Sequence, residues 1–171
     1  MMAKSLRPTA RRRSAARLAA VQALYDAEMT GASVEAVLAD FIDHGLGSRT
    51  LLDGGDQEET EVVLTEPDPL LFAAILRGVT LRRDQLDAMV GGALTGEWTV
   101  DRLEAVLRAI LRAGAYELAD RADIPPKVTI SEYVDVAGAF YSGPEPGLVN
   151  AVLDRIARVV RAGGIGDDAA H

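Results

Sequence analysis

The sequence predicts an all-α protein, a single domain of about seven helices, and three observations support this prediction. Apolar residues recur at spacings of three and four along most of the chain, and no stretch alternates apolar and polar residues as a half-buried strand does. Glycine and proline mark short connections between the periodic stretches. With 171 residues, 49% of them hydrophobic, the chain can bury a core. Helices joined by short connections are typical of a bundle.

The first helix is expected to begin between Thr9 and Ser14 and to run to about Met29, with Gly31 as its stop. Its apolar positions fall on one face: Leu18, Val21, Leu24, Tyr25 and Met29. A second helix is expected after Ser33, whose hydroxyl is suited to cap it.

The start of the chain is strongly basic although the protein as a whole is acidic. The net charge of −8 is the balance of +6 in residues 1–17 and −14 in the rest. The basic residues are Lys4, Arg7, Arg11, Arg12, Arg13 and Arg17. Cations in a first helical turn oppose the helix dipole, and a local rule broken this heavily often marks a functional site. The pattern predicts a localised site for phosphate, with a solvated tail as the equally weighted alternative.

The expected domain organisation follows from these features. Residues 1–13 are a partly flexible basic arm, residues 14–162 the helical domain, and residues 163–171 a disordered tail. Within the domain, residues 45–66 are rich in acidic residues and glycine and are expected to form a solvated surface loop. Because these carboxylates lack the spacing of a calcium loop, a metal site there is the less favoured interpretation.

Asp68 and Pro69 are expected to open a third helix, as its N-cap and first residue, and this helix is expected to reach Gly91–Gly92 and end by Gly96. The next helix start is expected at Thr99, as an N-cap, with Trp98 packed on Leu103 in a structural role.

The stretch 108–126 is the centre of the predicted bundle. Large apolar residues surround Gly114 and Ala115, which would allow another helix to approach closely. Ile124-Pro125-Pro126 is expected to end this helix. A sixth helix is expected from about Lys127 to Phe140, and a strongly amphipathic last helix from 148 to 160.

No catalytic constellation is present in the sequence. The chain has no cysteine, and its two histidines, His44 and His171, lie near no nucleophile or metal-ligand spacing. It also lacks a phosphate-binding glycine motif, a signal peptide and an apolar run long enough to span a membrane. We therefore expect a cytoplasmic protein that is not an enzyme and uses no metal or cofactor.

Three stretches, in order along the chain, resemble the NusB family of bacterial transcription antitermination factors. The first is Arg11-Arg12-Arg13 followed by Val21-Gln22-Ala23-Leu24-Tyr25. The second runs from Ala109-Ile110-Leu111-Arg112 through Tyr116-Glu117-Leu118 to Asp123-Ile124-Pro125. The third comprises Lys127-Val128, Ser131-Glu132 and Val149-Asn150-Ala151-Val152-Leu153-Asp154.

The resemblance implies two three-helix sub-bundles sharing one core, and a scaffold function. Such proteins bind the boxA element of nascent single-stranded RNA as a heterodimer with NusE, a small-subunit ribosomal protein. The assembly joins other Nus factors on RNA polymerase and suppresses termination, notably on ribosomal RNA operons.

Carried onto this sequence, the resemblance assigns the RNA contacts to Arg11, Arg12, Arg13 and Arg17, with Lys127 as a further one. Guanidinium groups suit phosphate and can stack on unpaired bases. Tyr25 would lie near the partner-protein surface, although a core tyrosine is an equally weighted interpretation. Structural roles within the bundle are expected for Tyr116, Glu117 and Asn150.

Three departures from the family pattern bear on function. Pro126 replaces an aromatic residue, Gly147-Leu148 replaces a Lys-Phe pair, and Leu107 replaces an acidic residue that is frequent at the partner interface. A lost lysine removes a phosphate contact, and lost aromatics remove stacking surfaces worth about 1–3 kcal/mol each where stacking is used. We therefore expect weaker intrinsic RNA binding and stronger dependence on the partner protein.

Two alternatives are also compatible with the sequence. One is a NusB-like domain that targets an RNA-modifying enzyme. The other is a homodimer in which the arginine arm folds across its twin and hides the RNA site, because the alanine-rich first helix permits close packing.

Overall fold

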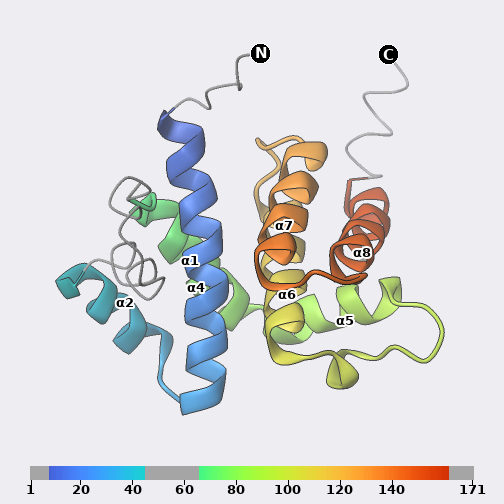
Figure 1. Ribbon diagram of the computed structural model, residues 1–171, viewed down its shortest axis with the longest axis horizontal. Coiled ribbons are helices and arrows are strands. Elements are labelled where there is room, and N and C mark those ends of the chain that lie inside the picture. The colour runs from blue at the N-terminus through green and yellow to red at the C-terminus, as the bar shows by residue number, and fades with distance from the viewer. Residues whose placement is uncertain (1–7, 45–65, 162–171) are drawn as a thin grey trace. The chain divides into compact units, whose positions relative to one another are not determined.

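Figure 1 shows the computed structural model, which describes residues 8–44 and 66–161. These ranges contain helices and no strand, so the all-α prediction is confirmed. The helices are α1 (Pro8–Thr30), α2 (Val34–His44), α4 (Pro69–Leu81), α5 (Arg83–Ala93), the short 3₁₀ helix η2 (Val100–Arg102), α6 (Ala105–Asp120), α7 (Pro126–Phe140) and α8 (Glu145–Val160). Among the described helices, none is long and apolar enough to cross a membrane. The predicted tail at 163–171 lies outside the described residues, and so does all of the predicted loop at 45–66 except Glu66.

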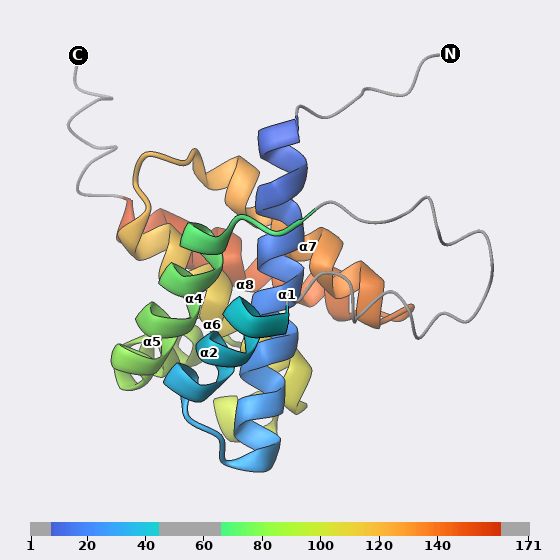
Figure 2. The same ribbon diagram turned by 90° about the vertical axis from the view of Figure 1, so that its left-hand side faces the viewer.

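The structure divides into two compact units, one up to Leu76 and one from Arg77, so that the boundary falls within α4. In the first unit, α1 contacts α2, which lies beside it in Figure 2. α1 begins at Pro8, just ahead of the predicted range, so the three consecutive arginines are helical. It ends as predicted at Gly31, whose φ of 76° is the left-handed conformation that glycine adopts at helix ends.

Side-chain caps fix the starts of α2 and α4 where the sequence predicted them. Ser33 Oγ accepts a hydrogen bond from the backbone N–H of Ala36 at 3.1 Å. Asp68 Oδ1 accepts bonds from the backbone N–H groups of Leu70 and Leu71 at 3.0 and 3.2 Å. Each cap satisfies helical donors that have no partner within the helix.

In the second unit, α6 contacts α5, α7 and α8, and α7 packs along α8 (Figure 1). All residues of α6 from Leu107 to Leu118 are buried except Arg108. A Cβ at Gly114 would lie 2.8 Å from a methyl carbon of Leu153 on α8, so this glycine permits the close approach of the two helices. The prediction of a central helix buried on all sides is confirmed.

Two structural residues on α6 also lie where the sequence placed them. Tyr116 is buried, and Glu117 is fully buried and accepts a hydrogen bond from the hydroxyl of Tyr133 on α7. Buried polar groups need such partners because they have lost their bonds to water. The same expectation for Asn150 was wrong. Asn150 is exposed, since it lies on the outer side of α8, away from the buried stripe that includes Val149 and Val152.

The predicted third helix is in fact two helices. The chain turns at Arg82, whose φ of −112° and ψ of 21° lie outside the helical range. The Arg82 side chain donates to Gln85 Oε1 at 2.8 Å and forms an ion pair with Asp120 at the end of α6. Apolar residues keep their helical spacing on both sides of the turn. The sequence pattern therefore did not predict that the helix is interrupted at a single residue.

The boundaries of the central helix also differ from the prediction. Thr99 makes no side-chain cap; the short η2 follows it, and α6 begins only at Ala105. At its other end α6 stops at Asp120, several residues before Pro125. The Arg161 guanidinium, beyond α8, donates to the backbone carbonyls of Leu118, Arg121 and Ile124 at 2.9, 3.2 and 3.2 Å. This long-range contact gives the carbonyl of Leu118, in the last turn of α6, a donor from outside the helix, and it joins the end of α8 to the connection between α6 and α7.

Candidate nucleic-acid interface

The arginine cluster, defined as Arg11, Arg12 and Arg13, lies near the start of α1. Arg11 and Arg12 are exposed, and Arg13 is half-buried. Consecutive residues of a helix point about 100° apart, so the three long side chains spread around the end of the helix. A spread of this kind suits contacts to successive phosphates of a chain rather than to one small anion.

The start of α1 favours anions for reasons beyond the arginines. Its first turn contains no acidic residue, and the backbone N–H groups at a helix start carry the positive end of the helix dipole. The backbone N–H of Asp68 donates to the carbonyl oxygen of Arg12 at 2.9 Å, which ties the backbone of the arginine cluster to the start of α4. The arginine cluster therefore extends from an anchored stretch of backbone.

Arg17 does not share the environment of the arginine cluster. It is only 2% exposed and interacts with other groups of the protein. Its neighbours Ala16, Ala19 and Ala20 are buried as well, so this side of α1 faces the interior. The expectation of an RNA contact at Arg17 is therefore corrected to an internal role, because a phosphate cannot reach a buried guanidinium.

The other two predicted site residues are accessible to different degrees. Lys127 is exposed at the second residue of α7, in the second unit, and follows Pro125 and Pro126. An ammonium group there can reach a phosphate in solvent. Tyr25, on α1, is half-buried, so one part of its ring packs against the protein and another part remains free for a contact.

Comparison with known proteins shows to which protein family this chain belongs. The NusB family model matches residues 14–158, which include every helix described above except the start of α1 and the end of α8. The chain belongs to the NusB family. The resemblance seen in the sequence motifs is thereby confirmed over most of the chain. The arginine cluster lies just ahead of the matched range, at the N-terminal end of the NusB-type first helix.

Similar proteins carry the same family name. The transcription antitermination protein NusB of Rhodospirillum rubrum is 49% identical over 157 residues, covering 88% of this chain and 85% of that protein. The protein of that name from Mesorhizobium japonicum is 48% identical over 160 residues, covering 94% of this chain and 97% of that protein.

Solved NusB structures share the fold. The NusB structure from T. maritima has a TM-score of 0.64 at 28% identity and covers 85% of this chain and 90% of that chain. A NusB crystallised with NusE and dsRNA has a TM-score of 0.64 at 19% identity, covering 87% of this chain and 98% of that chain, a likeness of fold alone.

Proposed function

We propose that this chain is a non-enzymatic transcription antitermination factor that binds RNA. The observation that carries the proposal is the arginine cluster on an anchored helix start in a chain of the NusB family. Guanidinium groups form paired hydrogen bonds to phosphate and stack on unpaired bases. Net charge is −8, so attraction to RNA is confined to the basic start of the chain and a few further residues such as Lys127.

We further propose a specific RNA and specific protein partners. The RNA is the single-stranded boxA element of ribosomal RNA operons, bound jointly with NusE, and the assembly joins other Nus factors on RNA polymerase. The names of the similar proteins support antitermination, and the NusB solved with NusE and dsRNA supports a joint protein and RNA complex. Tyr25 is proposed to contact the partner protein.

The proposal is tested by fluorescence anisotropy of a labelled boxA RNA, titrated with this protein in the absence and presence of purified NusE. We expect weak binding alone, tighter binding with NusE, and preference over a scrambled RNA of the same composition. A Kd for boxA that NusE leaves unchanged would refute the partner dependence. Absence of binding in both arms, together with a dimer by light scattering, would replace the proposal with the homodimeric scaffold.

A further inference from the structure

The start of α1 extends beyond the part of that helix that is buried. Ala16 and Arg17 are the first buried residues of α1, and every residue from Pro8 to Ala15 is exposed or half-buried. Cations near a helix start oppose the helix dipole, and the first turn contains no acidic residue that would offset them. Helix ends that are not packed open easily. The helical form of this stretch, which carries the arginine cluster, therefore depends on contacts from outside α1.

The start of α4 provides such a contact. Figure 2 shows the stretch that leads into α4 lying against the N-terminal part of α1. There the backbone N–H of Asp68 donates to the carbonyl oxygen of Arg12 at 2.9 Å. Arg12 is the middle residue of the arginine cluster, so this bond holds the backbone from which all three guanidinium groups extend.

The surroundings of Asp68 fix the direction of its N–H group. Asp68 Oδ1 accepts hydrogen bonds from the N–H groups of Leu70 and Leu71, so the residue that contacts α1 also caps α4. Pro67, just before it, is buried. Pro69, just after it, disfavours the helical conformation for Asp68. The cap and the two prolines therefore hold the Asp68 backbone in place independently of its bond to α1.

We propose that Asp68 is a positioning residue for RNA binding. Its cap keeps its own N–H directed at the Arg12 carbonyl, and this bond keeps the arginine cluster helical before RNA binds. A cluster that is ordered in advance binds more tightly, because complex formation then costs less conformational entropy. This inference rests on the proposed RNA binding by the arginine cluster and adds a residue that acts through Arg12 rather than on the RNA.

The charge and the cap of Asp68 have opposite effects on RNA binding. A carboxylate close to the arginine cluster repels phosphate, so by charge alone its removal would strengthen binding. Loss of the cap weakens binding, because the Asp68 N–H then loses its fixed direction. Alanine and asparagine substitutions separate the two effects, since both remove the charge and only asparagine remains a good N-cap.

The first measurement is the affinity for labelled boxA RNA with NusE present, by anisotropy, for three variants of Asp68. Asp68→Ala is expected to bind roughly fivefold more weakly than the parent protein, as the loss of an N-cap of ordinary strength predicts. Asp68→Asn is expected to bind at least as tightly as the parent. Asp68→Pro removes the N–H donor as well as the cap, and is expected to bind no more tightly than Asp68→Ala.

Ser33→Ala is the matched control, because it removes the cap of α2, a bond from the N–H of Ala36 to Ser33 Oγ. Ser33 lies beyond the other end of α1, whose last residue, Thr30, is roughly 27 Å along the helix from Arg12. Urea denaturation establishes the stability that each variant loses. A lost cap lowers stability in both alanine variants, but only Asp68→Ala is expected to weaken RNA binding.

Hydrogen exchange of the α1 amides, recorded without RNA, tests the ordering of the arginine cluster directly. The amides of residues 13–16 are expected to exchange roughly fivefold faster or more in Asp68→Ala than in the parent protein. Asp68→Asn and Ser33→Ala are expected to exchange at the parent rate in this stretch. A general loss of stability would not confine the change to the start of α1.

Three results would overturn the proposal. One is parent-like RNA binding by Asp68→Ala, and another is unchanged amide exchange at the start of α1 in that variant. The third is equally tightened binding by Asp68→Ala and Asp68→Asn, which charge alone would explain. Absence of RNA binding by the parent protein would instead refute the proposed function, whereas failure of the Asp68 variants alone leaves RNA binding by the arginine cluster standing.

Discussion

At the scale of single residues, some arginines of this chain are exposed to solvent and available to a ligand, whereas others hold the fold together. Arg11 and Arg12 are exposed near a helix start, whereas Arg17 is buried and Arg161 holds three backbone carbonyls. The sequence pattern groups Arg17 with the others because it lies one turn from Arg13. Only the surroundings of a side chain decide whether its guanidinium meets solvent, and a single sequence does not contain them.

Gly78→Ala is expected to destabilise the protein. A Cβ at Gly78 would overlap the ring of Tyr116, which is buried and rigid and cannot bend aside as an aliphatic chain can. Overpacking of this kind costs about 1–3 kcal/mol or more, which exceeds the helical preference for alanine. Urea denaturation measures the change in free energy of unfolding.

Gly138→Ala is the matched control, because nothing lies within 4 Å of a Cβ at Gly138 and the residue is exposed on α7. Here only the helical preference acts, so stability is expected to rise by up to about 1 kcal/mol. Equal effects of the two substitutions would contradict the packing of Gly78 against Tyr116.

Gly147→Lys is expected to strengthen RNA binding. The family pattern has a lysine at this position, and nothing lies within 4 Å of a Cβ at Gly147. One added phosphate contact steepens the dependence of log K on log salt by about 0.7 for single-stranded RNA. Anisotropy with boxA RNA at several salt concentrations measures the slope. If Gly138→Lys steepens the salt dependence of RNA binding as much as Gly147→Lys does, position 147 makes no specific contact with the RNA.

At the scale of elements, the starts of helices were predictable where a side chain close in sequence caps them. Ser33 and Asp68 are such cases, and the burial of α6 followed from its own apolar pattern. The break at Arg82 and the end of α6 were not predictable, since both depend on contacts with distant residues.

Arg161→Lys is expected to destabilise the protein although the charge is kept. Lysine cannot donate to three carbonyls from one planar group, so the connection between α6 and α7 loses hydrogen bonds worth about 0.5–1.5 kcal/mol each. Arg158→Lys is the matched control, because its exposed pair with Asp154 contributes only about 0.3–0.5 kcal/mol. Equal shifts in urea midpoint would argue against the role of Arg161.

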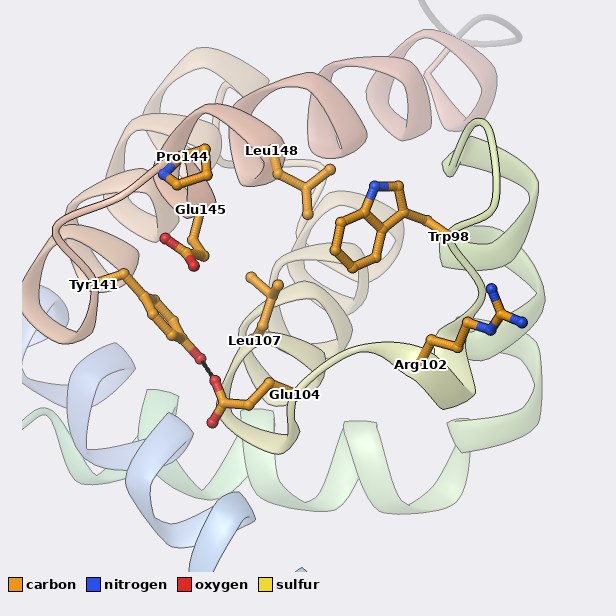
Figure 3. Close-up of a pocket in the computed structure, with 8 residues that line it drawn as sticks. All are labelled: Trp98, Arg102, Glu104, Leu107, Tyr141, Pro144, Glu145 and Leu148. Atoms are coloured by element: carbon orange, nitrogen blue, oxygen red, sulfur yellow. Dashed lines mark hydrogen bonds between the residues drawn. The ribbon is translucent and has the colours of Figure 1, made fainter.

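At the scale of the whole molecule, the sequence motifs identified the fold class and the family, and the charge pattern indicated the arginine cluster. A pocket of about 480 Å³ beside Trp98 in the second unit, whose lining Figure 3 shows, was missed. Its lining combines Trp98 and Leu107 with Tyr141, which lies far along the sequence from both, and the sequence analysis did not connect these residues. Surfaces made from distant segments leave no local signal, whereas a run of arginines does.

RNA binding by the arginine cluster is tested by comparing two triple variants. Arg11/Arg12/Arg13→Ala and the control Arg77/Arg83/Arg158→Ala remove the same charge, and each control residue is exposed on another stretch of helix. Anisotropy with boxA RNA and NusE is recorded at several salt concentrations. We expect the first variant to lose roughly tenfold or more in affinity and to lower the salt slope by about 2, with the control near the parent. Equal losses in both variants, or none in the first, would show that the arginine cluster is not the RNA-binding surface.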